Sequence, residues 1–133
     1  MSTVFLDTVG LLALWDSSDQ WHGAADVVFR QLLVQRYHCV TTSFVLLECG
    51  NAAARYSYRT DVYDLRQEME AHGNIVVPGE DDQRSAWEAY HRGDAAQAGI
   101  VDLVSFVVMR RLGITDAFTN DSHFRAAGFV TLF

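Results

Sequence analysis

The chain has 133 residues, half of them hydrophobic, with 17 acidic and 10 basic side chains and a formal net charge of −7. This length predicts a single domain, residues 1–133, with one hydrophobic core. The acidic balance argues against a basic surface for nonspecific nucleic-acid binding, and the absence of lysine excludes P-loop and Schiff-base mechanisms.

An acidic protein can still act on nucleic acids, because clustered carboxylates bind a divalent metal ion that contacts phosphate. We expect no membrane span, since the longest nearly apolar stretch, Gly99–Met109, contains Asp102 and falls short of about 20 residues. The N-terminus lacks the pattern of a secretory signal, so we expect a cytoplasmic protein. Cys39 and Cys49 are expected to be reduced packing residues, because their spacing does not suit zinc.

Apolar runs and helical spacing predict an alternation of strands and helices. In chain order, the expected elements are a strand at Thr3–Leu6, a short helix at Leu11–Trp15, a helix at Asp19–Gln35, a strand at Cys39–Thr42, a helix from Ser43 to about Tyr58, a helix at Asp61–His72, a strand at Ile75–Val77, a helix at Glu80–Arg92, a connection at Gly93–Ala98, a helix at Gly99–Leu112, a strand at Ala117–Thr119, a short helix at Ser122–Ala127 and a strand at Val130–Leu132. Ser18, Ser43 and Thr60 are expected N-caps, and Gly73 and Gly113 are expected helix ends. This alternation predicts a three-layer α/β/α fold with a parallel sheet of four to five strands.

Most of the acidic residues have polar neighbours and are expected to be solvated, among them Asp81, Asp82, Glu68 and Glu70. Three others, Asp7, Glu48 and Asp102, are lone charges within apolar runs. Burial of an unpaired carboxylate costs several kcal/mol or forces its protonation. A cluster of carboxylates that shares a divalent cation would offset this cost.

The sheet itself supports such a cluster. In parallel sheets, ligands bind beyond the carboxyl ends of the strands, and Asp7 and Asp121 each follow a predicted strand. Structural alternatives remain for each acid. Asp7, Asp102 and Asp121 could simply cap the helices that follow them, and Glu48, placed in mid-helix, could form a buried salt bridge with an arginine.

Other residues are candidates for supporting roles around these acids. Ser105 follows Asp102 on the same helical face and could hold a metal-bound water or phosphate, or be a satisfied core serine. Thr119 precedes Asp121 by two residues and could orient its carboxylate. Arg55 and Arg59 lie on nearly the face of Glu48 and could hold RNA, or be solvated arginines. Asp116 is an extra acid that we interpret as a turn residue.

Together these residues resemble the PIN domain, and within it the VapC-type ribonuclease toxins of prokaryotic toxin–antitoxin pairs. The matching segments, in chain order, are Val4-Phe5-Leu6-Asp7-Thr8, Leu46-Leu47-Glu48, Val101 to Phe106, Arg111 to Ile114 and Ala117 to Phe124. Their order, spacing and the chain length all agree. Val9 departs from the pattern, because many members of the family carry a small polar residue at that position.

The resemblance implies strand order 3-2-1-4-5, an acidic site of Asp7, Glu48, Asp102 and Asp121 with Thr119 in support, and Mg²⁺ or Mn²⁺ as cofactor. It also implies an RNA substrate, a homodimer, and an antitoxin whose tail covers the acidic groove. The predicted reaction is metal-assisted phosphodiester hydrolysis, with Asp102 or Glu48 orienting the attacking water.

Alternative functions stay open at this point. The chain could be a PIN-like module that binds RNA or protein without cleavage, or a housekeeping RNA-processing nuclease. A haloacid-dehalogenase-like phosphatase is excluded by Val9, where a second aspartate is needed, and by the missing lysine. A receiver domain fails because it needs the same lysine.

Overall fold

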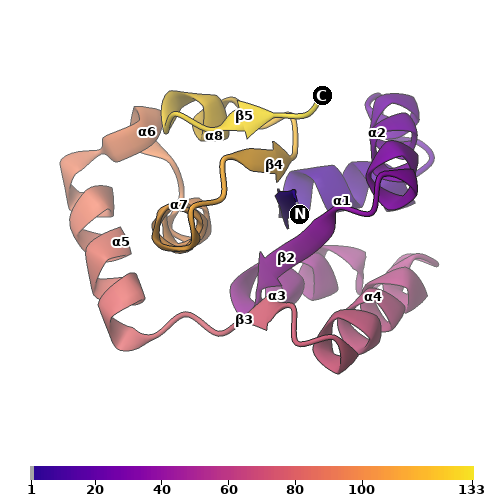
Figure 1. Cartoon of the computed structure of the whole chain (residues 1–133), viewed down its shortest axis with the longest axis horizontal. Coiled ribbons are helices and arrows are strands. Elements are labelled where there is room, and N and C mark those ends of the chain that lie inside the picture. Colours follow the sequence, from indigo (N-terminus) through magenta and orange to yellow (C-terminus); the bar gives the residue numbers. More distant parts are fainter. Residues whose placement is uncertain (1) are drawn as a thin grey trace.

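The five strands of the described part of the chain pair in one parallel sheet, in the order β3-β2-β1-β4-β5 (Figure 1). The structure is a computed structural model that describes residues 2–133. The strands span Thr3–Leu6 (β1), His38–Thr42 (β2), Ile75–Val76 (β3), Asp116–Phe118 (β4) and Val130–Thr131 (β5). The predicted fold class and the predicted strand order are therefore confirmed.

Helices on both sides of the sheet connect the strands (Figure 1). They span Thr8–Trp15 (α1), His22–Val34 (α2), Ser43–Ala53 (α3), Arg59–Ala71 (α4), Glu80–Arg92 (α5), Asp94–Gln97 (α6), Ile100–Leu112 (α7) and Ser122–Ala126 (α8). Within the described residues, 2–133, no helix is long and apolar enough to cross a membrane. Both cysteines are free thiols, as expected, with Cys49 buried and Cys39 half-buried.

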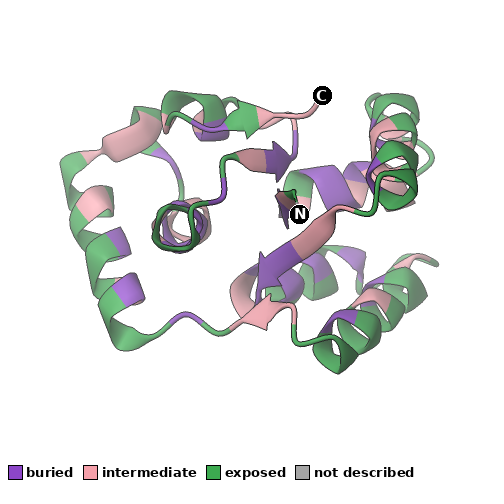
Figure 2. Cartoon of the chain, in the orientation of Figure 1, coloured by how far each residue is buried: buried purple, intermediate pink, exposed green. Residues whose placement is uncertain are grey.

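The central strand β1 is buried on both faces. Val4, Phe5 and Leu6 have no exposed surface, and this continuous apolar run is typical of a parallel strand covered by helices on both sides. Figure 2 shows buried residues along the central strands and exposed residues on the outer turns of the helices. Leu6 is in register with Phe118 of β4, so the chain leaves both strands at the same edge of the sheet.

Helix α1 begins three residues earlier than predicted, directly after β1. Asp7 is its N-cap and accepts a hydrogen bond from the backbone N–H of Val9. Gly10 permits this early start, because a Cβ atom there would lie only 2.0 Å from the backbone oxygen of Phe118. The glycine therefore lets α1 pack against the end of β4.

Three of the predicted helix caps are wrong. The amide and hydroxyl of Ser18 bind the carboxylate of Asp16, and α2 begins only at His22. Thr42 caps α3 in place of Ser43, which is the first helical residue. These polar side chains find partners two or three residues away, and such local contacts decide where a helix begins.

The expected long helix from Ser43 to Tyr58 is also wrong, since α3 ends at Ala53. Helix α4 then begins at Arg59, so Thr60 lies inside the helix and does not cap it. At the predicted connection 93–98, α6 is not a regular right-handed helix, because Ala95 and Ala96 have φ values of 54° and 56°.

One acid that was expected to be solvated is largely buried. Asp82 is 9% exposed and receives two hydrogen bonds from the Arg111 guanidinium, at 3.1 and 2.8 Å. It also accepts from the N–H of Gly79 at the start of α5. The hydrogen bonds from Arg111 lower the pKa of Asp82. This ion pair joins the end of α7 to the beginning of α5. The residues next to Asp82 in the sequence do not indicate it, because Arg111 lies 29 residues further along the chain.

Candidate metal centre

The four predicted acids lie around the carboxyl edge of β1 and β4. Asp7 follows β1 and Asp121 precedes α8, while Glu48 and Asp102 lie on α3 and α7. The pKa of Asp102 is raised to about 8, mainly by burial and then by the charges of Asp7, Asp121 and Glu48. The structure therefore places four acids from separate parts of the chain close enough for their charges to interact.

Asp7 is the most deeply buried of the four, with 1% of its surface exposed. Burial raises its pKa to about 7, and the charge of Asp121 adds to this, against the lowering effect of the hydrogen bond from Thr119. That bond joins the Thr119 hydroxyl to Oδ2 of Asp7 over 2.9 Å. The capping alternative is also correct, since Val9 N–H donates to the same oxygen over 3.3 Å.

Thr119 thus contacts a different acid from the one predicted. Its hydroxyl donates to the Asp7 carboxylate and accepts from the backbone N–H of Asp121 over 3.1 Å. The prediction that Thr119 orients the carboxylate of Asp121 is wrong, because β1 and β4 are neighbours and place Asp7 within reach of the hydroxyl. One threonine therefore links the loops that follow both strands.

Asp121 caps α8, and two nitrogen atoms of His123 contact the same carboxylate oxygen. Its Oδ1 accepts from the backbone N–H of His123 over 2.9 Å and lies 2.8 Å from Nδ1 of the same residue. The other oxygen, Oδ2, has no hydrogen bond to the residues that the structure describes. The cap leaves one carboxylate oxygen of Asp121 available to a ligand.

Glu48 is half-buried and receives a hydrogen bond from the Thr8 hydroxyl, over 2.7 Å. The alternative of a buried salt bridge is wrong, because no arginine of residues 2–133 pairs with Glu48. Thr8 also supplies a polar contact beside the first acid, where the side chain of Val9 is apolar and 39% exposed. The threonine hydroxyl directs one oxygen of Glu48.

Asp102 lies in the first turn of α7, which begins at Ile100 with Gly99 as its N-cap. The alternative that Asp102 caps this helix is therefore wrong. Its carboxylate forms no hydrogen bond and no ion pair with residues 2–133. Among the four acids, Asp102 has the side chain least committed to a protein partner.

The donor set fits a divalent metal ion. The four carboxylates offer oxygen ligands, which hard cations prefer, and within residues 2–133 no arginine forms an ion pair with any of them. One ligand atom each from Asp102, Asp121 and His123 lie within 4.8 Å of one another. A divalent cation would offset the mutual repulsion that raises the pKa values of Asp7 and Asp102.

The other candidates from the sequence do not join this cluster. Ser105 is fully buried and donates to the Val101 carbonyl of its own helix over 3.1 Å, as expected for a satisfied core serine. Asp116 is the first residue of β4, and the acidic cluster lies beyond the opposite end of that strand. The core-serine alternative for Ser105 is therefore confirmed, whereas the interpretation of Asp116 as a turn residue is wrong, because this residue pairs within the sheet.

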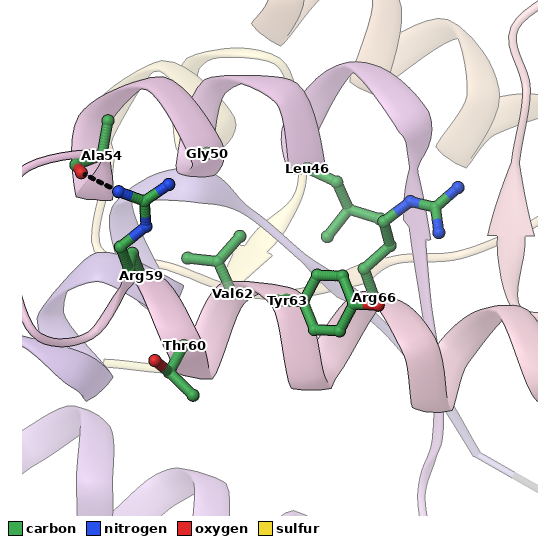
Figure 3. Close-up of a pocket in the computed structure, with 8 residues that line it drawn as sticks. All are labelled: Leu46, Gly50, Ala54, Arg59, Thr60, Val62, Tyr63 and Arg66. Carbon is green, nitrogen blue, oxygen red and sulfur yellow. Dashed lines mark hydrogen bonds between the residues drawn. The ribbon is translucent and has the colours of Figure 1, made fainter.

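Arg55 and Arg59 are not on the face of Glu48, because α3 ends at Ala53. Both side chains are exposed, and Nη1 of Arg59 donates to the Ala54 carbonyl over 2.9 Å. Figure 3 shows Arg59 at one end of a groove between α3 and α4. That groove, about 430 Å³, is lined by none of the four acids.

His123 is the residue that sequence reasoning missed. Its position two residues after Asp121, in the first turn of a short helix, was the available signal. A side chain at that position can fold back onto the capping acid, and here Nδ1 lies 2.8 Å from Oδ1 of Asp121. The imidazole therefore belongs to the candidate metal centre.

Known proteins resemble this chain along nearly its whole length. It is 31% identical to the 23S rRNA-specific endonuclease VapC20 of Mycobacterium tuberculosis, over 96% of this chain and 95% of the relative. The crystal structure of that protein, described as a sarcin-ricin loop cleaving toxin, superposes with a TM-score of 0.80 at 30% identity, over 96% of this chain and 97% of that one.

A more distant structure, FitAcB from Neisseria gonorrhoeae, shares the fold with a TM-score of 0.65 at 14% identity, over 97% of this chain and 96% of that one. The family model of the PIN domain matches residues 4–130. This match covers all four acids, Thr119 and His123, and part or all of each of the five strands. The chain is therefore a member of the PIN domain family.

Proposed function

We propose that this protein is a divalent-metal-dependent endoribonuclease and the toxin of a toxin–antitoxin pair. One observation carries the proposal: four carboxylates, two on α3 and α7 and two at the starts of α1 and α8, lie close enough for their charges to interact, and no arginine within residues 2–133 pairs with any of them. Such a site needs a divalent cation before it can accept a phosphodiester, since the bare acids would repel it.

Asp7, Glu48, Asp102 and Asp121 would hold the metal, which we propose to be Mg²⁺ or Mn²⁺. When bound, the ion supplies an activated water and stabilises the negative charge on the phosphate. Thr119, the residue after β4, holds Asp7 in place through its hydroxyl, and Thr8 directs Glu48. Asp102 has no hydrogen-bond or ion-pair partner within residues 2–133, so its free oxygens are suited to accept a hydrogen bond from the attacking water.

The substrate is RNA, and the first RNA to test is a ribosomal hairpin. This part of the proposal rests on the relative described as a 23S rRNA-specific endonuclease, which is 31% identical over almost the full length of both chains. The acidic net charge agrees with recognition through metal and shape, because a net charge of −7 does not attract RNA by itself.

We further propose that residues 1–133 act as one nuclease domain, in the cytoplasm, as a homodimer held inactive by an antitoxin. An antitoxin segment that covers the acidic edge would be basic, since four carboxylates without arginine partners attract positive side chains. Growth arrest on expression of this chain, relieved by co-expression of the protein encoded beside it, would support the toxin assignment. Unimpaired growth with active nuclease would favour a housekeeping role.

The test of the nuclease is cleavage of a 5′-labelled ribosomal hairpin with Mg²⁺, with Mn²⁺ and with a chelator. We expect cleavage only with metal, and a loss of at least a hundredfold in Asp7→Asn. Asp64→Asn is the matched control, because Asp64 is an exposed acid on α4. Equal cleavage by Asp7→Asn and wild type would refute the site, and RNA binding without cleavage would favour a binding module.

A further inference from the structure

The imidazole of His123 lies beside the acidic cluster and has no other described partner. Its Nδ1 is 2.8 Å from Oδ1 of Asp121, and the side chain is 38% exposed. No other hydrogen bond holds this ring among residues 2–133. The backbone N–H of His123 already satisfies the capping role by donating to the same oxygen. The cap of α8 therefore does not need the imidazole.

The distances around His123 are close to those between ligands of a single metal ion. With metal–ligand bonds of about 2.1 Å, adjacent ligands lie about 3 Å apart and opposite ligands about 4.2 Å apart. Nδ1 of His123 and Oδ1 of Asp121 are 2.8 Å apart, and one ligand atom each from His123, Asp121 and Asp102 lie within 4.8 Å of one another. A single ion can contact all three groups after only small adjustments.

We infer that His123 is a ligand of the metal ion in this site, and that it makes the site prefer transition-metal ions such as Mn²⁺ over Mg²⁺. This inference deepens the proposed function and rests on its metal site. Oxygen-only sites suit Mg²⁺, which binds nitrogen poorly, whereas first-row transition metals accept an imidazole readily. One nitrogen among carboxylate oxygens is therefore enough to separate the two ions.

The direct test is pulsed electron paramagnetic resonance of the full chain loaded with Mn²⁺. Electron spin-echo modulation detects a ¹⁴N nucleus bound to the ion, and we expect this signal in the wild type. His123→Gln should remove it, while His91→Gln should retain it, because His91 is an exposed residue on α5. The wild-type spectrum needs no variant, so a misfolded mutant cannot obscure the result.

Titration calorimetry with Mn²⁺ and Mg²⁺ gives a second readout. In His123→Gln, the Kd for Mn²⁺ should rise about tenfold or more, and the Kd for Mg²⁺ should change by less than about twofold. The backbone hydrogen bond of residue 123 to Asp121 persists in this variant, so α8 keeps its cap. Circular dichroism melting should confirm that the fold is retained.

Three outcomes would overturn the inference or its basis, and they are distinguishable. Mn²⁺ bound to the wild type without ¹⁴N modulation shows that His123 is not a ligand, while the carboxylate site stands. An equal loss of affinity for both ions, again without the nitrogen signal, assigns His123 to orienting Asp121 only. A wild type that binds neither ion refutes the metal site itself.

Discussion

Replacement of Asp7 by asparagine should stabilise the metal-free protein while destroying its metal site. Asp7 is 1% exposed, and burial raises its pKa from 3.8 to about 7. The folded state therefore favours the neutral carboxyl group and is destabilised when this group ionises. Asparagine removes the ionisable proton, remains a good N-cap for α1 and can still accept the hydrogen bond from Thr119.

The size and pH dependence of the effect follow from the two pKa values. A raised carboxyl pKa contributes stability at low pH that is lost as the pH rises from 3.8 through about 7. The interval of about three pH units corresponds to about 4 kcal/mol above pH 7, at about 1.4 kcal/mol per unit. At pH 5, ionisation of Asp7 destabilises the folded wild type by only about 1 to 2 kcal/mol.

The assay is thermal unfolding of wild type and Asp7→Asn in a chelator at pH 5 and pH 8. We expect a higher Tm for the variant at pH 8, by on the order of 10 °C, and a smaller difference at pH 5. Added Mn²⁺ should stabilise the wild type alone, by about 2.7 kcal/mol at a hundred times Kd. The exposed-residue variant Asp64→Asn should melt like the wild type.

Equal Tm values at pH 8 would refute this reasoning, because an ionised Asp7 would then cost nothing in the fold. A difference that does not change between pH 5 and pH 8 would also contradict it, since the effect would then come from packing and not from ionisation.

Three further predictions concern the fold and the support of the site. Gly10→Ala should destabilise the protein by about 1–3 kcal/mol in urea unfolding, because the added Cβ would overlap the β4 backbone. The control Gly50→Ala should be neutral or slightly stabilising, because the space around Gly50 is open. Equal stability of the two variants would contradict the tight contact at Gly10. Arg111→Ala should cost about 1–2 kcal/mol at pH 7, because it leaves Asp82 buried without its partner. Since Arg111 lowers the pKa of Asp82 from its ordinary value of 3.8, this difference should shrink as the pH falls below about 4 and disappear once Asp82 is protonated in the folded wild type, and a difference that does not shrink would refute the ion-pair explanation. Thr119→Val should weaken Mn²⁺ binding in calorimetry by about tenfold or more, with Thr119→Ser close to wild type; unchanged binding in the valine variant would show that the hydroxyl does not support the site.

Several features of the acidic site were predictable because they depend on residues close in sequence. A charged residue within an apolar run is recognisable without a structure, and so Asp7, Glu48 and Asp102 were identified by their neighbours. The periods of the apolar residues likewise predicted alternating strands and helices, and with them a parallel sheet. Asp121 followed, since an acid after a strand lies at the edge where ligands bind.

Helix boundaries were less predictable, since they depend on competition between nearby polar groups. Ser18 was a reasonable N-cap by residue type, but the Asp16 carboxylate lies within reach and binds both its amide and its hydroxyl. Similarly, α3 ends at Ala53 and not near Tyr58, so Arg55 lies outside the helix and not on the helical face of Glu48. A shift of a few residues rotates a side chain to another side of the helix.

The sequence alone thus determined the fold class and the identity of the four acids, because apolar periodicity and isolated charges are local properties. Only the tertiary structure decided which groups meet. Thr119 binds Asp7, 112 residues away in the chain, because β4 pairs with β1. Asp82 is buried because α7 carries Arg111 to it. Such partners depend on how the strands and helices are arranged, and the local pattern of residues does not contain that arrangement.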